Sequence, residues 1–88
     1  MKRYVQVASV TSVEGAVTPT DVFWDEGKRY HIDRVLDRRP AASLKVGGKG
    51  MRYLVEIAGR QSYLYYEGPA WFVEEIVRNA PVYATPPL

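Results

Sequence analysis

The residues best suited to chemistry in this sequence are basic side chains around a glycine-rich segment. Five of them are candidate nucleic-acid-binding residues: Arg38, Arg39, Lys45, Lys49 and Arg52. No Asp or Glu occurs from residue 38 to residue 55, so the segment contains no acid to neutralise them. Lysine and arginine on a glycine-broken loop can follow a phosphate backbone, because counterion release supplies affinity without a fixed geometry. The segment therefore predicts binding of nucleic acid or another polyanion, and the alternative is a solvated loop.

Charge is divided unevenly along the chain. Residues 28–60 carry nine Lys and Arg against three Asp and Glu, a balance of +6, whereas the other residues have a balance of −4. The net charge of the whole chain is only +2. A chain polarised in this way can still present one positive face.

Aromatic residues later in the sequence offer a second kind of binding surface. On a strand, Tyr63 and Tyr65 share one face and Tyr66 takes the other. Tyrosines on a sheet beside the basic segment can stack on bases. An exposed Tyr66 beside Trp71 would instead form a protein-binding patch, and both residues are candidates for that role. This alternative is an accessory or scaffolding domain that binds a protein through exposed aromatic residues or an open strand edge. The alternative is that these rings fill the interior of a small barrel.

Catalytic and metal chemistry has little support in the sequence. His31 is the single histidine, with Asp33 on the same strand face and Asp37 as a further carboxylate. No motif ties a serine to this pair, cysteine is absent, and the GGKG of residues 47–50 lacks the spacing and the Ser or Thr of a P-loop. We therefore predict a binding module that is not an enzyme and holds no metal or cofactor.

Length and composition fit one small domain. With 88 residues, 47% of them hydrophobic, the chain can bury a single core, which we place at residues 1–80, followed by a proline-rich flexible tail at residues 81–88. The N-terminal residues alternate polar and apolar side chains, which is typical neither of a signal peptide nor of a membrane span. Together with the absence of cysteine, this predicts a cytoplasmic protein without a membrane partner.

The elements that must position these residues are β-strands. Residues 3–13 predict a first strand whose alternation slips before Val10, which indicates a bulge or a bend. An interruption at residues 18–21, where proline withholds an amide, precedes a brief strand at residues 22–24. Residues 25–28 then supply the turn of a hairpin.

The next predicted strand contains an irregularity. Tyr30 and Ile32 keep a two-residue period that fails at Val35 and Leu36, where two apolar residues are adjacent. Such a strand is bulged or sharply coiled, as small barrels require. Residues 40–46 fit a helical turn, an extended segment or a wide loop.

The clearest hairpin follows. It consists of a strand, a turn and a second strand over residues 51–57, 58–61 and 62–67. We expect the two strands to lie side by side, with Tyr53 and Val55 paired with the aromatic residues Tyr63 and Tyr65.

The last segment is the most ambiguous in the chain. After a break at residues 68–69, a strand is favoured through about residue 75, with a helix as the alternative. The whole pattern predicts an all-β fold of five to six antiparallel strands, an SH3-like barrel or a strongly coiled sheet, with one short helical turn as an option.

The order of these motifs resembles a group of small, uncharacterised bacterial domains. It is more distantly similar to the uncharacterised β-domain at the C-terminal end of some Y-family DNA polymerases. The matching residues are Phe23, Trp24, Gly27, Tyr30, Ile32, Val35, Leu36, Asp37, Tyr53, Val55, Tyr63, Leu64, Tyr65, Trp71, Phe72, Val73 and Glu74. They are core residues of a β-fold, so the resemblance implies an SH3-like barrel or coiled sheet and supplies no catalytic residues.

Overall fold

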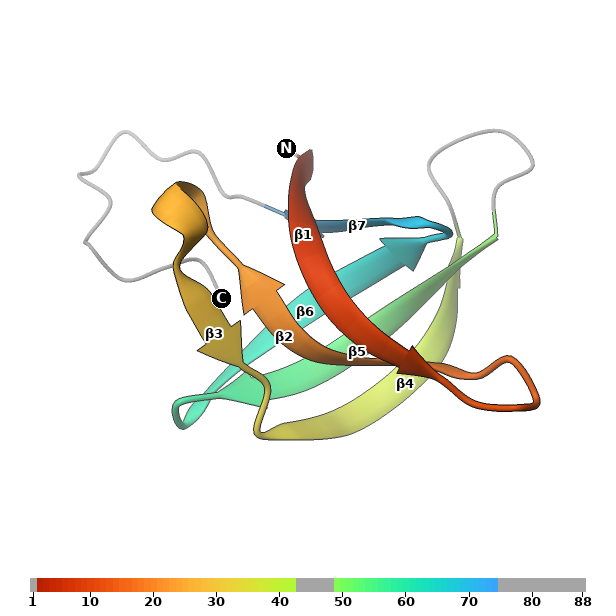
Figure 1. Ribbon diagram of the computed structural model, residues 1–88. Helices are drawn as coiled ribbons and strands as arrows, with labels where there is room; N and C mark the ends of the chain where they lie inside the picture. Colours follow the sequence, from red (N-terminus) through yellow and green to blue (C-terminus); the bar gives the residue numbers. More distant parts are fainter. Residues whose placement is uncertain (1, 43–48, 75–88) are drawn as a thin grey trace.

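The chain folds into a curled antiparallel β-sheet. The computed structural model describes residues 2–42 and 49–74, and over these ranges it contains seven strands and one 3-10 turn. They are β1 (Lys2–Thr11), β2 (Val17–Phe23), η1 (Asp25–Gly27), β3 (Arg29–His31), β4 (Arg34–Ala42), β5 (Lys49–Ile57), β6 (Arg60–Glu67) and β7 (Ala70–Glu74). The strand order β3-β2-β1-β7-β6-β5-β4 forms a half-barrel (Figure 1). The predicted all-β class is therefore confirmed.

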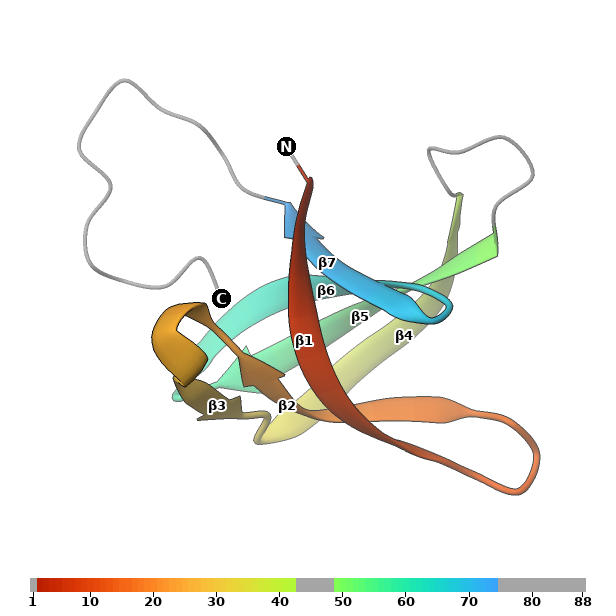
Figure 2. The same ribbon diagram turned by 45° about the horizontal axis from the view of Figure 1, so that its top comes forward.

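Strand β1 belongs to both halves of the sheet. Its first residues pair with β7, from Lys2 opposite Glu74 to Val5 opposite Trp71. From Gln6 onwards β1 pairs with β2 instead. Figure 2 shows β1 crossing from β7 towards β2 along a curved path. One coiled strand shared by two pairings is the means by which a short sheet curls around a core.

The irregularity predicted before Val10 is present, but it lies on the neighbouring strand. Ala8 pairs with Asp21 and Ser9 pairs with Pro19, so Thr20 is the extra residue of a bulge. The Thr20 hydroxyl oxygen lies 3.1 Å from the Ala8 carbonyl oxygen. Residues 18–21 therefore continue a strand, and the predicted interruption there is wrong, because the proline falls where the ladder is already irregular.

The predicted strand around residues 30–36 divides into two strands at opposite edges of the sheet. The Ile32 amide donates to the Thr20 carbonyl of β2, whereas the Asp33 amide donates to the Glu56 carbonyl of β5. The chain passes from one edge of the sheet to the other between these two residues. The described ranges therefore contain seven strands, one more than the predicted maximum of six.

The bulge predicted at Val35 and Leu36 is confirmed. Val35 pairs with Val55, but Asp37 pairs with Leu54, so Leu36 has no partner in the register between β4 and β5. Its side chain is 39% exposed. The extra residue increases the local twist and lets Val35 keep its place against the core.

The β5–β6 hairpin corrects one prediction. Its turn has two residues, Ala58 and Gly59, with φ of 51° and 79°, instead of the four expected. This turn sets Tyr53 opposite Leu64 and Val55 opposite Ser62. The expected pairing of Tyr53 and Val55 with Tyr63 and Tyr65 is wrong, because the shorter turn shifts the register.

The C-terminal end of the described chain is a strand. Ala70–Glu74 forms β7, as favoured from the sequence. The helical alternative beyond it, the tail at residues 81–88, and residues 43–48 lie outside the described residues. Pro40 and Ala41, for which three conformations were open, belong to β4. Across the described ranges, no helix has the length and apolarity needed to cross a bilayer.

The core lies on the inner side of the curl. It consists of buried residues from β2, the β3–β4 connection, β5, β6 and β7: Val22, Ile32, Tyr53, Val55, Ile57, Leu64, Trp71 and Val73. The Tyr53 hydroxyl donates a hydrogen bond to the Val17 carbonyl, which ties β5 to β2 across the interior. Burying a side chain such as Leu64 stabilises the fold by roughly 1.5–3 kcal/mol.

Candidate nucleic-acid interface

A row of aromatic and basic side chains crosses the outer face of the sheet. Strand pairing places one residue of each of five neighbouring strands in this row: Tyr4 of β1, Phe72 of β7, Tyr65 of β6, Arg52 of β5 and Arg39 of β4. Neighbouring strands lie about 4.8 Å apart, so directly paired side chains contact one another. We call this set the outer row.

The aromatic half of the outer row is a packed cluster. The Tyr65 and Phe72 rings are stacked, with centroids 4.9 Å apart and an interplanar angle of 6°. Tyr4 contacts the other side of Phe72 edge-on at 5.7 Å, and Lys2 Nζ lies 4.5 Å from the same centroid. Phe72 is consequently 6% exposed although it faces away from the core, whereas Tyr4 is 51% exposed.

The basic half of the outer row brings two arginines face to face. Arg39 and Arg52 are directly paired across β4 and β5, and like charges in that position destabilise a sheet. Arg39 Nε lies 2.7 Å from Asp37 Oδ2, which offsets part of its charge. Arg52 lies over the ring of Tyr63, 4.6 Å from its centroid, and Tyr63 is 44% exposed. Arg52 thus contacts an exposed aromatic ring and lies beside a second cation, Arg39.

The structure divides the predicted basic residues between two faces. Arg39 and Arg52 lie on the outer face, but Arg38 pairs with the buried Tyr53 and therefore lies on the inner face. Lys49 begins β5, and Lys45 lies outside the described residues. The five candidates thus do not form one continuous strip, because successive strand residues point to opposite faces.

The predicted aromatic pair is together but is not a surface patch. Tyr66 and Trp71 are paired across β6 and β7, and their ring centroids are 4.4 Å apart. Trp71 is 5% exposed and belongs to the core, and Tyr66 is half-buried against it. The arrangement matches the alternative in which these rings fill the interior.

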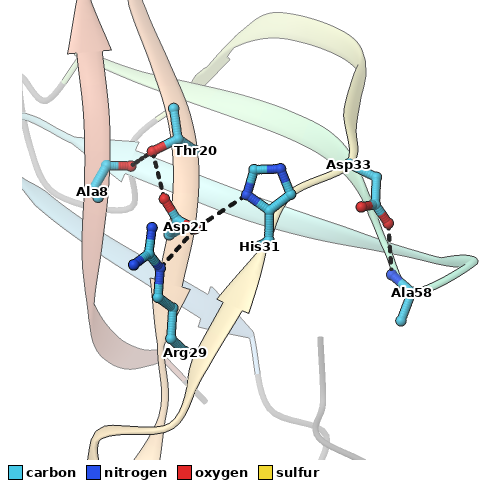
Figure 3. Close-up of polar contacts among 7 residues, drawn as sticks. All are labelled: Ala8, Thr20, Asp21, Arg29, His31, Asp33 and Ala58. Atoms are coloured by element: carbon cyan, nitrogen blue, oxygen red, sulfur yellow. Dashed lines mark hydrogen bonds and ion pairs between the residues drawn. The ribbon is translucent and has the colours of Figure 1, made fainter.

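Figure 3 shows that His31 pairs with a different acid from the one expected. His31 Nδ1 lies 3.2 Å from Asp21 Oδ1, whereas Asp33 accepts a hydrogen bond from the Ala58 amide at 2.9 Å. The predicted His31–Asp33 pair is therefore wrong, because the chain changes edge between these residues. In the described ranges, no cluster of His, Asp or Glu has the geometry of a metal site.

Asp21 is a carboxylate held by several donors. Arg29 Nε lies 3.1 Å from Oδ1 and the Thr20 hydroxyl donates to Oδ2 at 2.9 Å. The hydrogen bond from Arg29 is the largest cause that lowers the pKa of Asp21 to about 2, and burial opposes it. The same contact raises the pKa of Arg29. These groups hold β2 and β3 together, because Asp21 and His31 are directly paired.

Over residues 2–42 and 49–74, the two edge strands of the sheet are poorly suited to pairing with another chain. Edge strand β3 has three residues. Edge strand β4 carries the Leu36 bulge, Pro40 and charged side chains along its length. Short, bulged, proline-containing and charged edges are the usual protection against strand addition. The geometry therefore favours the sheet face over the sheet edge as a binding surface.

Sequence reasoning missed the contribution of β1 and β7 to this surface. Tyr4 and Phe72 join Tyr65 only because β1 lies beside β7, which brings the two ends of the described chain together. The sequence signal for the position of Phe72 was the alternation of side chains along β7, which sets Phe72 on the face opposite Trp71.

Comparisons of the chain with protein-family models, with curated proteins and with solved structures find no match.

Proposed function

We propose that the outer face binds single-stranded nucleic acid through Arg52, Tyr63 and Arg39. The observation that carries the proposal is the contact between Arg52 and the exposed ring of Tyr63, beside a second, directly paired arginine. A phosphate between Arg39 and Arg52 would remove their mutual repulsion, and the Tyr63 ring offers a platform for a base. The proposal continues the expectation of a cytoplasmic binding module without catalytic activity.

Single strands fit this surface better than a duplex. Bases of a single strand are free to stack on aromatic rings, and each such contact contributes about 1–3 kcal/mol. A duplex keeps its bases paired and would use the cations alone. With only two arginines in the outer row, a purely ionic contact would be weak.

Fluorescence anisotropy with labelled oligonucleotides tests the proposal. We expect the full chain to bind single-stranded DNA or RNA more tightly than duplex of the same length at low salt, and affinity to fall with added salt. Arg52→Gln and Tyr63→Ala should each weaken single-strand binding about tenfold.

Arg60→Gln is the matched control. It removes the same charge from the same hairpin, but Arg60 pairs with Ile57 beside the turn, five pairs and about 17 Å from Arg52. Its affinity should be close to that of the unmodified chain. Absence of single-strand binding at low salt, or equal losses for Arg52→Gln and Arg60→Gln, would exclude this surface. Retention of a lysate protein after nuclease treatment would favour the protein-binding alternative instead.

A further inference from the structure

A cleft of about 360 Å³ opens on the inner side of the half-barrel. One side is formed by the turn between β1 and β2, and the other by β4, β5 and β6; the lining residues are Glu14, Gly15, Ala16, Val17, Arg38, Met51, Tyr53 and Tyr66. Its volume lies in the range of small-molecule sites, about 300–1,000 Å³, and the mouth of a barrel is a common place for such sites.

Two opposite charges line this cleft. Arg38 comes from β4 and Glu14 from the β1–β2 turn, and both side chains are exposed. Among the residues that the structure describes, no ion pair joins Arg38 to a carboxylate. Burial raises the pKa of Tyr53, and the nearby Arg38 guanidinium opposes that effect. Arg38 is directly paired with Tyr53 across β4 and β5, and within residues 2–42 and 49–74 no carboxylate forms an ion pair with it.

The rest of the lining is largely apolar. Met51 and Val17 are half-buried and pack against the core. Tyr66 lines the cleft and is held in place by its contact with Trp71. A hydrophobic group that entered the cleft would thus meet a rigid aromatic ring and a flexible thioether, a combination that adapts to side chains of different shapes.

We propose that the cleft binds a small zwitterion with an apolar body, of the class of free amino acids with large hydrophobic side chains. Arg38 takes the carboxylate, Glu14 takes the ammonium group, and the side chain lies against Met51 and Tyr66. A polyanion is disfavoured here, because Glu14 repels additional negative charge. The site is independent of the outer face, since Arg38 and Arg39 point to opposite sides of β4.

Isothermal titration calorimetry with three related probes tests this assignment. Phenylalanine carries both charges, 3-phenylpropanoate only the acid, and phenethylamine only the amine. We expect phenylalanine to bind at least tenfold more tightly than either analogue. Arg38→Gln should remove its advantage over phenethylamine, and Glu14→Gln its advantage over 3-phenylpropanoate.

Arg39→Gln is the matched control, because it removes the same charge from the adjacent residue of the same strand. It should leave phenylalanine binding unchanged, whereas Arg38→Gln should leave oligonucleotide binding within about twofold of that of the unmodified chain. Thermal unfolding of each variant checks that it is folded. Failure of phenylalanine to bind at millimolar concentration, equal affinity for all three probes, or equal losses for Arg38→Gln and Arg39→Gln would overturn the proposal.

Discussion

Strand β4 places two adjacent arginines in different surroundings. Arg38 faces the inner side of the curl, opposite Tyr53 and beside the cleft, whereas Arg39 faces the outer side, opposite Arg52. Their charges and side chains are identical, so the difference comes from the two-residue period of a strand alone. A run of basic residues on a β-strand is therefore divided between the two faces of the sheet. The residues on each face must be identified before a function is assigned to them.

The same division applies to the aromatic residues. Leu64 and Tyr66 of β6 face inward, while Tyr63 and Tyr65 face outward. Tyr53 and Trp71 inside are almost fully buried, whereas Tyr4 and Tyr63 outside are about half exposed. The inner face thus supplies most of the burial that stabilises the fold, and the outer face retains rings available to a partner.

The sharpest test of this division compares neighbours on β6. Leu64 is fully buried and Tyr63 is 44% exposed. We expect Leu64→Ala to lower the free energy of unfolding by about 2–5 kcal/mol, because it leaves a cavity. Tyr63→Ala should cost about 1 kcal/mol or less, chiefly its contact with Arg52. Urea denaturation followed by circular dichroism measures both, and similar losses would mean that the two faces do not differ in burial.

A second comparison concerns hydroxyl groups on the two faces. Tyr53→Phe removes the donor to the Val17 carbonyl in the interior, and we expect a loss of about 1–2 kcal/mol. Tyr63→Phe on the outer face should change stability by less than about 0.5 kcal/mol. The same denaturation experiment applies. A neutral Tyr53→Phe would show that the carbonyl finds another donor.

Asp21 allows the comparison to be extended to acid pH. Its pKa of about 2 in the folded protein is below the value of about 3.9 for an unfolded chain. Its contribution is therefore fully present above pH 4 and is lost as the pH falls towards 2. We expect Asp21→Asn and Arg29→Gln to reduce the loss of stability over this window, measured by thermal unfolding at a series of pH values. Unaltered acid sensitivity in both variants would argue against this ion pair.

The smallest expected effect concerns the turn that determines which face each residue occupies. Ala58 has a positive φ of 51°, which asparagine tolerates better than alanine. Ala58→Asn would give the Asn-Gly sequence typical of two-residue hairpins and should stabilise the fold by about 0.5 kcal/mol. Chemical denaturation of matched samples can resolve this difference. Destabilisation would indicate that the turn has another geometry in solution.

Local patterns in the sequence predicted much of this fold. Adjacent apolar residues at Val35 and Leu36 revealed the bulge, and alternation along β6 separated Tyr63 from Tyr66. Pro19 was misread because a proline is compatible with a strand at a bulge. Such an exception depends on the neighbouring strand and leaves no local signal.

The candidate site was less predictable than the fold. The sequence places Arg38 and Arg39 side by side, but only strand pairing reveals that Arg52 joins the second and not the first. Glu14 and Tyr66 line one cleft although they are far apart in the chain. His31 meets Asp21 because β2 and β3 pair, a contact that spacing along one strand cannot indicate. Non-local pairing thus accounts for each of these differences.

The junction between β1 and β7 has a consequence for the order of folding. In the described ranges, the backbone pairing that joins the β1–β3 half of the sheet to the β4–β7 half is a ladder of four residue pairs, Lys2–Val5 with Trp71–Glu74. Each half forms from hairpins of nearby residues, but this ladder must close a loop of about 65 residues, at a larger entropic cost. We therefore expect docking of the two halves to be the late, slow event, and the outer row to form only after it.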